Sequence, residues 1–165
     1  MTNAIWKPVY VGVGSNIENP RAQVEKAIDK LRALSPKFRV VLVSPLYGTK
    51  PFGPVAQPDF VNGVVSALTQ LDPQTLLKEF QATEAALGRP AERQKWGPRV
   101  IDLDLLIYGR ERLQAPDLTL PHPGIVERNF VLYPLADIAP DLDVPGLGKV
   151  AELKRQVAQA GIWPL

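Results

Sequence analysis

The sequence has no cysteine, one histidine and no long hydrophobic run, and each absence excludes a class of protein. Without cysteine there is no disulfide scaffold, cysteine nucleophile or zinc finger, and a lone histidine rules out a histidine-rich metal cage. Any metal must therefore be bound by oxygen. No apolar stretch approaches the ~20 residues of a membrane span, and the N-terminus lacks the pattern of a secretory signal. We expect a cytoplasmic protein with no membrane partner.

An excess of charge is also missing. The formal net charge is +2, and the basic residues are scattered along the chain, so we expect no nucleic-acid partner. A chain of 165 residues, 45% hydrophobic and 22% charged, suits one globular domain over residues 1–165. We expect that domain to be a monomer.

Hydrophobic periodicity and turn residues predict the order of the elements. We expect a strand over 9–13, a helix from 20 to about 34, strands over 38–44 and 60–68, a helix from 73 to 87 and a strand over 100–108. Residues 47–58 are rich in Gly and Pro and are predicted to be a long loop. The order βαββαβ is that of a ferredoxin-like α+β sandwich whose helices cover one sheet face. Extra C-terminal strands and helices follow, the last helix being indicated by Leu153, Val157 and Ala160.

The segment 100–108 is the most informative, because two carboxylates, Asp102 and Asp104, interrupt an apolar strand. Strand side chains alternate, so we expect one face to carry Ile101, Leu103, Leu105 and Ile107 and the other Val100, Asp102, Asp104, Leu106 and Tyr108. Two residues of strand separate the carboxylates by roughly 6 to 7 Å. That spacing suits Mg²⁺, which binds through one or two carboxylates together with waters and substrate phosphates. The alternative is an acidic, solvated strand face.

Basic residues near these carboxylates indicate a phosphate ligand. Arg99 directly precedes the carboxylate strand, and Arg89, Arg93 and Lys95 lie in the irregular stretch before it. The guanidinium fork matches phosphate oxygens. For Arg93 and Lys95 a solvated loop is an equal alternative. The glycine segment 12–16 lacks the Lys-Ser/Thr ending of a P-loop, so we interpret it as a tight turn.

Several other residues are candidates for ligand contacts. Prolines on both sides of His122 restrict its backbone, and Arg128 and Phe130 follow, so a cation, an imidazole and an aromatic ring are able to meet at one ligand, although a lone histidine is more often structural. A flat heterocycle would suit Phe52, Phe60 and Phe130, with Asn62 to contact its edge, unless these residues only pack the core. Trp96 is either a lid residue or a buried anchor.

Together these segments resemble a known family. The motifs are Trp96-Gly97-Pro98-Arg99-x-x-Asp102-Leu103-Asp104, Leu120-Pro121-His122-Pro123, Arg128-x-Phe130 and Gly12-x-Gly14-Ser15-Asn16, with the segments 49–54 and 57–62. They look like those of the 6-hydroxymethyl-7,8-dihydropterin pyrophosphokinases of folate biosynthesis, from about residue 10 to residue 141. The resemblance implies transfer of pyrophosphate from the co-substrate ATP to the hydroxymethyl group of the pterin, with release of AMP, on a ferredoxin-like fold.

The resemblance also implies roles for single residues. Asp102 and Asp104 would bind two Mg²⁺ ions, and Arg89 and Arg99 would act with them in catalysis. The ATP contacts would be Gln81, Glu84, Arg99, His122 and Arg128. The pterin contacts would be Thr49, Phe52, Phe60, Asn62, Trp96 and Phe130. Family members often have a second arginine where this chain has Ala91 and a tyrosine where it has Pro123, and Arg93 is a candidate to replace the former.

Two other functions fit the same residues. A phosphohydrolase or nucleotidyl-transfer enzyme would keep the metal site but pass the phosphate to water or to another nucleotide. A nucleotide or pterin binding module would keep the pocket without turnover. Two metals and arginines neutralise phosphate charge without a dedicated protein base, so we name no general base.

Overall fold

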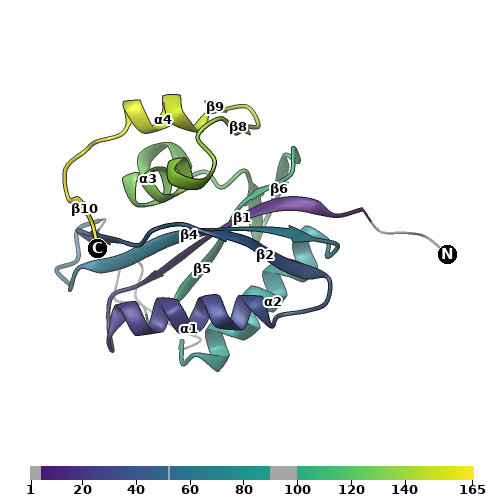
Figure 1. Cartoon of the computed structure of the whole chain (residues 1–165), viewed down its shortest axis with the longest axis horizontal. Helices are drawn as coiled ribbons and strands as arrows, with labels where there is room; N and C mark the ends of the chain where they lie inside the picture. The colour runs from purple at the N-terminus through teal and green to yellow at the C-terminus, as the bar shows by residue number, and fades with distance from the viewer. Residues whose placement is uncertain (1–4, 52, 90–99) are drawn as a thin grey trace.

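The computed structural model describes residues 5–51, 53–89 and 100–165. A central antiparallel sheet has helices on both faces (Figure 1). The helices are α1 (Pro20–Arg32), α2 (Pro73–Ala86), α3 (Asn129–Ile138) and α4 (Val150–Gln156), with a 3-10 turn η1 (Ile125–Glu127). The strands are β1 (Lys7–Ser15), β2 (Phe38–Val43), β3 (Tyr47–Thr49), β4 (Phe60–Thr69), β5 (Asp102–Tyr108), β6 (Leu113–Ala115), β7 (Leu118–Leu120), β8 (Asp143–Val144), β9 (Gly148–Lys149) and β10 (Ile162–Pro164).

The main sheet has six strands in the order β10-β3-β4-β1-β5, and β2 also pairs with β4. Every pair is antiparallel. One edge of β4 is shared, since β2 pairs with its second half and β3 with its first. The β3 strand lies inside the segment that we expected to be a loop, and that prediction is wrong there. Its three residues are too few to show an alternating pattern.

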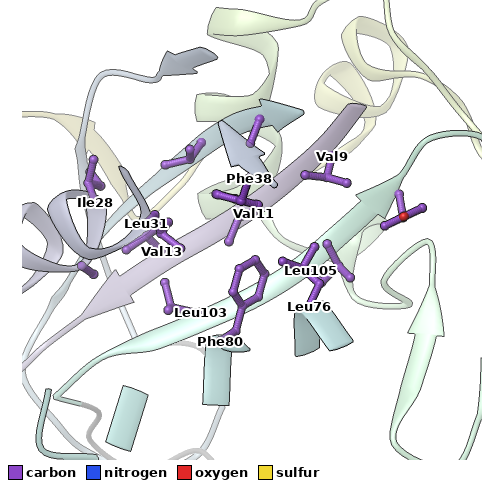
Figure 2. Packing of buried hydrophobic residues seen from close by; sticks show 14 of the residues in the cluster. Val9, Val11, Val13, Ile28, Leu31, Phe38, Leu76, Phe80, Leu103 and Leu105 are labelled. Atoms are coloured by element: carbon purple, nitrogen blue, oxygen red, sulfur yellow. The ribbon is translucent and has the colours of Figure 1, made fainter. Parts of the chain in front are cut away.

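The first core lies between the sheet and helices α1 and α2. Asn19 begins α1 by accepting a hydrogen bond from the Ala22 N–H, and Pro20 takes the first helical position. The buried stripes of the two helices face the strands, and Figure 2 shows Leu31 and Phe80 among the valines of β1 and the leucines of β5. The structure confirms the two predicted helices, and this core covers one face of the inner strands.

The second core covers the opposite face and corrects our expectation of helices on one face only. Helices α3 and α4 pack there around Leu106, Leu132 and Leu135. Sequence reasoning missed α3, which contains Pro134 in its interior. Proline there is normally a sign of a helix end, and burial of an almost wholly apolar segment overrides it. The last helix was predicted, but it ends at Gln156, before Val157 and Ala160.

A β-bulge in β5 changes the predicted alternation of its side chains. Tyr10 pairs with Ile107, whereas the next residue of β1 pairs with Leu105, so β5 has one extra residue. Leu106 and Ile107 therefore both belong to the second core, and Tyr108 returns to the first. The Tyr108 hydroxyl donates to the Leu71 carbonyl at 2.5 Å. Our placement of Ile107 and Tyr108 was wrong, but the expected alternation of Asp102 and Asp104 with Leu103 and Leu105 is confirmed.

Within the described ranges, no helix is both long and apolar enough to cross a membrane.

Candidate active site

Two glycines of β1 form the floor of the site. Gly14 pairs with Asp102 on one side and with Asn62 on the other, and Gly12 pairs in the same way with Asp104 and Val64. Cross-strand partners point to the same sheet face. The two carboxylates therefore share a face with the Asn62 amide, separated from it by a strand without side chains at these positions. We call Gly12 and Gly14 the glycine floor.

Gly14 is required by the close approach of Asn62. A Cβ atom at position 14 would overlap the Asn62 Oδ1, whereas one at Gly12 would meet the nearest atom, Leu106 Cδ1, at 3.6 Å. The Asn62 Nδ2 donates to the Thr49 Oγ1 at 2.8 Å, and both side chains are buried. The amide is thereby fixed next to the floor. Sequence reasoning treated the glycines as a turn and missed this role.

The carboxylate pair is electrostatically strained. Burial, and after it the charge of Asp102, raise the pKa of Asp104 to about 8, although Arg128 acts in the opposite direction. Among the described residues no group of three or more His, Cys, Asp and Glu side chains converges as a metal site. Two carboxylates on one face still fit Mg²⁺, because that ion completes its oxygen shell with water and phosphate.

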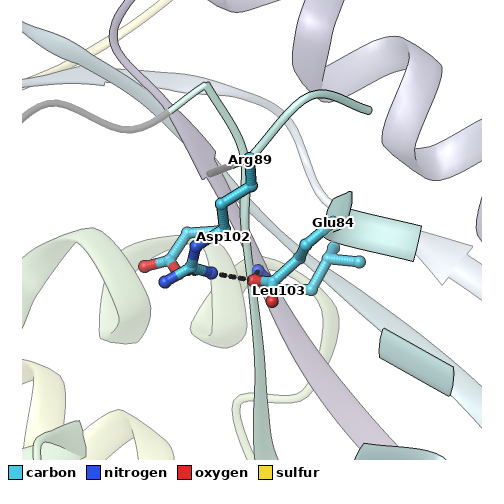
Figure 3. A network of polar contacts seen from close by, with 4 residues as sticks. All are labelled: Glu84, Arg89, Asp102 and Leu103. Atoms are coloured by element: carbon cyan, nitrogen blue, oxygen red, sulfur yellow. Dashed lines mark hydrogen bonds and ion pairs between the residues drawn. The ribbon is translucent and has the colours of Figure 1, made fainter. Parts of the chain in front are cut away.

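Arg89 connects helix α2 to the carboxylate strand. Figure 3 shows its guanidinium between Glu84 and Asp102. The Arg89 Nη1 contacts the Glu84 Oε2 and lies 2.7 Å from the Asp102 Oδ1, and the Arg89 side chain is only 6% exposed. The Glu84 Oε2 also accepts the Leu103 N–H at 2.8 Å. Burial raises the pKa of Glu84 to about 7, although the bond from Leu103 and the charge of Arg89 lower it.

His122 and Arg128 lie close enough to each other and to the carboxylates to interact electrostatically, and Phe130 lies next to Arg128. The His122 N–H donates to the Leu106 carbonyl at 2.8 Å, and its Nδ1 accepts the Gly124 N–H at 3.0 Å, so Nε2 carries the proton of the neutral ring. Burial, and then the charge of Arg128, lower the pKa of His122 to about 4. The Arg128 guanidinium lies 5.6 Å from the Phe130 ring centre.

A cavity of about 500 Å³ opens next to His122. Arg112, directly before β6, and Gln114 and Thr119 of the β6–β7 hairpin give it polar groups, and Leu147 lines it from the β8–β9 turn. Its size and mixed lining suit part of a small ligand. The carboxylates, the imidazole and this cavity lie on one side of the site. Together they suit the binding of a nucleotide and its phosphates.

The comparisons with known proteins agree with this geometry. Residues 10–140 match the model of the family described as 7,8-dihydro-6-hydroxymethylpterin-pyrophosphokinase (HPPK). The chain belongs to this family. HPPK enzymes transfer pyrophosphate from ATP to hydroxymethyldihydropterin in folate biosynthesis.

Curated relatives support the assignment to the HPPK family, and a solved structure of low sequence identity agrees with the fold. The 2-amino-4-hydroxy-6-hydroxymethyldihydropteridine pyrophosphokinase of Pseudomonas aeruginosa is 48% identical over 88% of this chain and 88% of its own. The Haemophilus influenzae protein of that name is 42% identical over 90% of this chain and 92% of its own. A crystal structure of Plasmodium falciparum HPPK-DHPS with pteroate has a TM-score of 0.73 at 13% identity, covering 94% of this chain and 43% of that one. That similarity shows the fold, and this chain spans less than half of the longer protein.

The structure brings together most of the residues named from the HPPK resemblance. Thr49, Asn62 and Phe60 lie on neighbouring strands β3 and β4, with Phe60 directly opposite Thr49. Gln81 is exposed on α2, about one turn before Glu84. Phe52, Trp96 and Arg99, with Arg93 and Lys95, lie outside the described residues.

One further site residue was missed. Asn16, directly after β1, is buried, and its Nδ2 donates to the Gln57 Oε1 at 2.8 Å and to the Pro58 carbonyl at 2.9 Å. These bonds fix the segment that leads into Phe60. In the sequence Asn16 ends the motif Gly12-x-Gly14-Ser15-Asn16, but an asparagine at that place is equally typical of a turn.

Proposed function

We propose that this chain transfers the pyrophosphoryl group of ATP to the hydroxymethyl group of 6-hydroxymethyl-7,8-dihydropterin across the glycine floor. The observation that carries the proposal is the cross-strand row of Asp102, Gly14 and Asn62 on neighbouring strands. In this row a carboxylate and a fixed amide lie on either side of a strand position that has no side chain. Pyrophosphate transfer needs a phosphate site and a ring site side by side. The row supports both, with the phosphates over β5 and the pterin over β4.

Asp102 and Asp104 are the residues that would hold two Mg²⁺ ions. The raised pKa of Asp104 supports this role. It reflects burial and repulsion between two carboxylates on one face, and a bound cation removes that repulsion. When bound, the ions supply neutralisation of phosphate charge and activation of the attacked bond. The protein itself would align the hydroxymethyl oxygen with the β-phosphorus of ATP.

The phosphates and the nucleoside would lie on the β7 side of the carboxylates. His122, neutral with its proton on Nε2, is placed to donate one hydrogen bond to a phosphate oxygen, and Arg128 supplies a charged donor. Arg99 and Gln81 are further proposed ATP contacts. The cavity lined by Gln114 and Thr119 would take the nucleoside.

The pterin would lie against β3 and β4. Asn62 offers an amide to the ring edge, and its bond to Thr49 fixes which atoms it presents. Phe60 and Phe130 are half-buried rings, and we assign both to this region together with Phe52 and Trp96.

The strand order β5-β1-β4-β2, with α1 and α2 on one face, supports a ferredoxin-like core within a single domain over residues 1–165. The monomeric state and the cytoplasmic location stay predictions.

The test is to incubate the protein with ATP, Mg²⁺ and the hydroxymethyl pterin and to follow the phosphorus resonances. We expect AMP and a pterin diphosphate, formed in equal amounts. ADP formation, or AMP with free pyrophosphate irrespective of the pterin, would instead support a kinase of another type or a phosphohydrolase. Binding of both ligands without any product would support the binding module.

A further inference from the structure

The turn after helix α2 brings Arg89 back over the end of the helix. Gly88 has a positive φ of 98°, the left-handed conformation that ends many helices. The Arg89 N–H then donates to the Glu84 carbonyl at 3.0 Å. This reversal is what allows the Arg89 side chain to reach the Glu84 carboxylate five residues earlier. The contact is therefore fixed by the backbone of the helix end.

Glu84 uses one oxygen for two partners. Its Oε2 accepts the Leu103 N–H, which points away from β1 at the open edge of the sheet, and contacts the Arg89 Nη1. The side chains of Glu84 and Arg89 are 9% and 6% exposed. A carboxylate so enclosed, whose Oε2 is already shared by Leu103 and Arg89, is poorly placed to touch a nucleotide.

Arg89, which Glu84 holds in place, also contacts Asp102, the proposed metal ligand. Its Nη1 lies 2.7 Å from the Asp102 Oδ1, and the Asp102 side chain is 31% exposed. Among the described residues the buried Arg89 Nε has no hydrogen-bond acceptor, so the guanidinium is held by these two carboxylates. Hydrogen bonds to a metal-binding carboxylate fix its orientation, and they leave the second oxygen, Oδ2, for the cation.

We infer that Glu84 is a positioning residue, which fixes Arg89 against Asp102 and anchors β5 between the two aspartates, and is not a nucleotide contact. The inference rests on the proposed function and replaces the ATP-binding role that the family resemblance implies for Glu84. It also predicts that Glu84 affects turnover only by holding Arg89 in place.

The test is a double-mutant cycle with Glu84→Gln and Arg89→Ala. Glu84→Gln keeps an acceptor for Leu103 but removes the charge that holds Arg89. We expect kcat to fall at least about tenfold, the range for lost supporting bonds at metal ligands, while the Kd of a non-hydrolysable ATP analogue with Mg²⁺ changes less than about threefold. In the Arg89→Ala background, Glu84→Gln should not lower kcat further. Glu25→Gln, which removes an exposed carboxylate paired with Arg21 on α1, is the matched control.

A spectroscopic readout separates this inference from the proposed function. In the wild-type chain the enclosed Arg89 Nε–H should exchange slowly with solvent by NMR, and Glu84→Gln should accelerate that exchange at least about tenfold, whatever the enzyme turns over. Glu25→Gln should leave it unchanged. If Glu84→Gln fails to fold, Glu84→Asp enters the same cycle, with the same dependence on Arg89 expected.

Three results would overturn the inference. The first is a tenfold weaker ATP analogue with kcat unchanged, which would make Glu84 a nucleotide contact. The second is an equal loss of kcat in both backgrounds, and the third is an unchanged kcat in Glu84→Gln. A wild-type chain that makes no pterin diphosphate would contradict the proposed function only. The exchange measurement would still decide whether Glu84 holds Arg89.

Discussion

The two sides of the glycine floor are built in opposite ways. On the β5 side, Glu84 and Asp102 contact Arg89, and Asp104 lies on the same strand face as Asp102. Burial raises the pKa of Glu84 and of Asp104. On the β4 side, Asn62 and Thr49 are neutral and satisfy each other at 2.8 Å. The acidic side stays strained until a cation binds, whereas the amide side is complete in the free protein. A strained site of this kind costs stability and is retained for function.

The amide side is also braced by the C-terminal segment. The β10 strand pairs with β3, and the Lys50 N–H donates to the Gly161 carbonyl at 2.8 Å. The indole of Trp163 lies on Gly48, so closely that a Cβ atom there would overlap it. The brace lies beyond the 10–140 region that matches the family model. It fixes the strand that holds Thr49. Among the described residues it has no counterpart on the acidic side, where β5 is an edge strand held by Glu84.

The largest effect is expected from removing the acidic side. Asp102→Ala or Asp104→Ala should lower the rate of AMP formation by about 10³-fold or more, because the charge that develops on the phosphates loses its counter-ions. The fold should remain intact by circular dichroism. Asp143→Ala, at an exposed position, is the control. Wild-type rates in both site variants would remove the metal-site argument.

The next largest effect separates the two glycines. Gly14→Ala pushes a methyl group into the Asn62 amide, whereas Gly12→Ala places one in ordinary contact, 3.8 Å from the Asp104 Cβ. Overpacking of this kind costs about 1–3 kcal/mol, so Gly14→Ala should raise the KM for the pterin by about tenfold to a hundredfold and leave the KM for ATP within about threefold. The Gly12→Ala enzyme is the control. Equal effects on both substrates would show that the two sides are not separate.

A stability measurement tests the strain on the acidic side. The pKa of Asp104 rises from 3.8 to about 8 on folding. A carboxyl whose pKa is raised stabilises the fold below its unfolded pKa and loses that contribution as the pH rises through its folded pKa. Without metal, Asp104→Asn should therefore exceed the wild type in free energy of unfolding by about 1–2 kcal/mol at pH 8.5 and match it near pH 4. Urea denaturation in EDTA measures this, and a less stable variant at pH 8.5 would contradict it.

The smallest effect concerns the brace. Trp163→Ala should raise the KM for the pterin by about fivefold, because β3 loses a packing partner and Thr49 orients Asn62 less firmly. The KM for ATP should stay the same. Trp6→Ala, which removes a ring contact with Arg39 at 4.6 Å outside the site, is the matched control. A change in the KM for ATP of the same size would show that the brace supports the whole sheet.

Sequence reasoning was strongest where a pattern is local. The alternation before the bulge placed Asp102 and Asp104 correctly on one face, and the Asn19-Pro20 signal located the start of α1. It failed where tertiary contacts decide. The bulge at Leu106 depends on pairing with β1, and α3 forms despite Pro134 because it is buried against the sheet. The Glu84–Arg89 contact was also out of reach, since it depends on the backbone reversal at Gly88 and on where β5 lies.

The most direct test of the two-sided site is a crystal structure with Mg²⁺, a non-hydrolysable ATP analogue and the hydroxymethyl pterin. We predict Mg²⁺ within about 2.0–2.1 Å of oxygens of both Asp102 and Asp104, and the pterin edge hydrogen-bonded to the Asn62 amide across Gly14. Metal bound elsewhere, or a pterin that lies away from Asn62, would contradict the account.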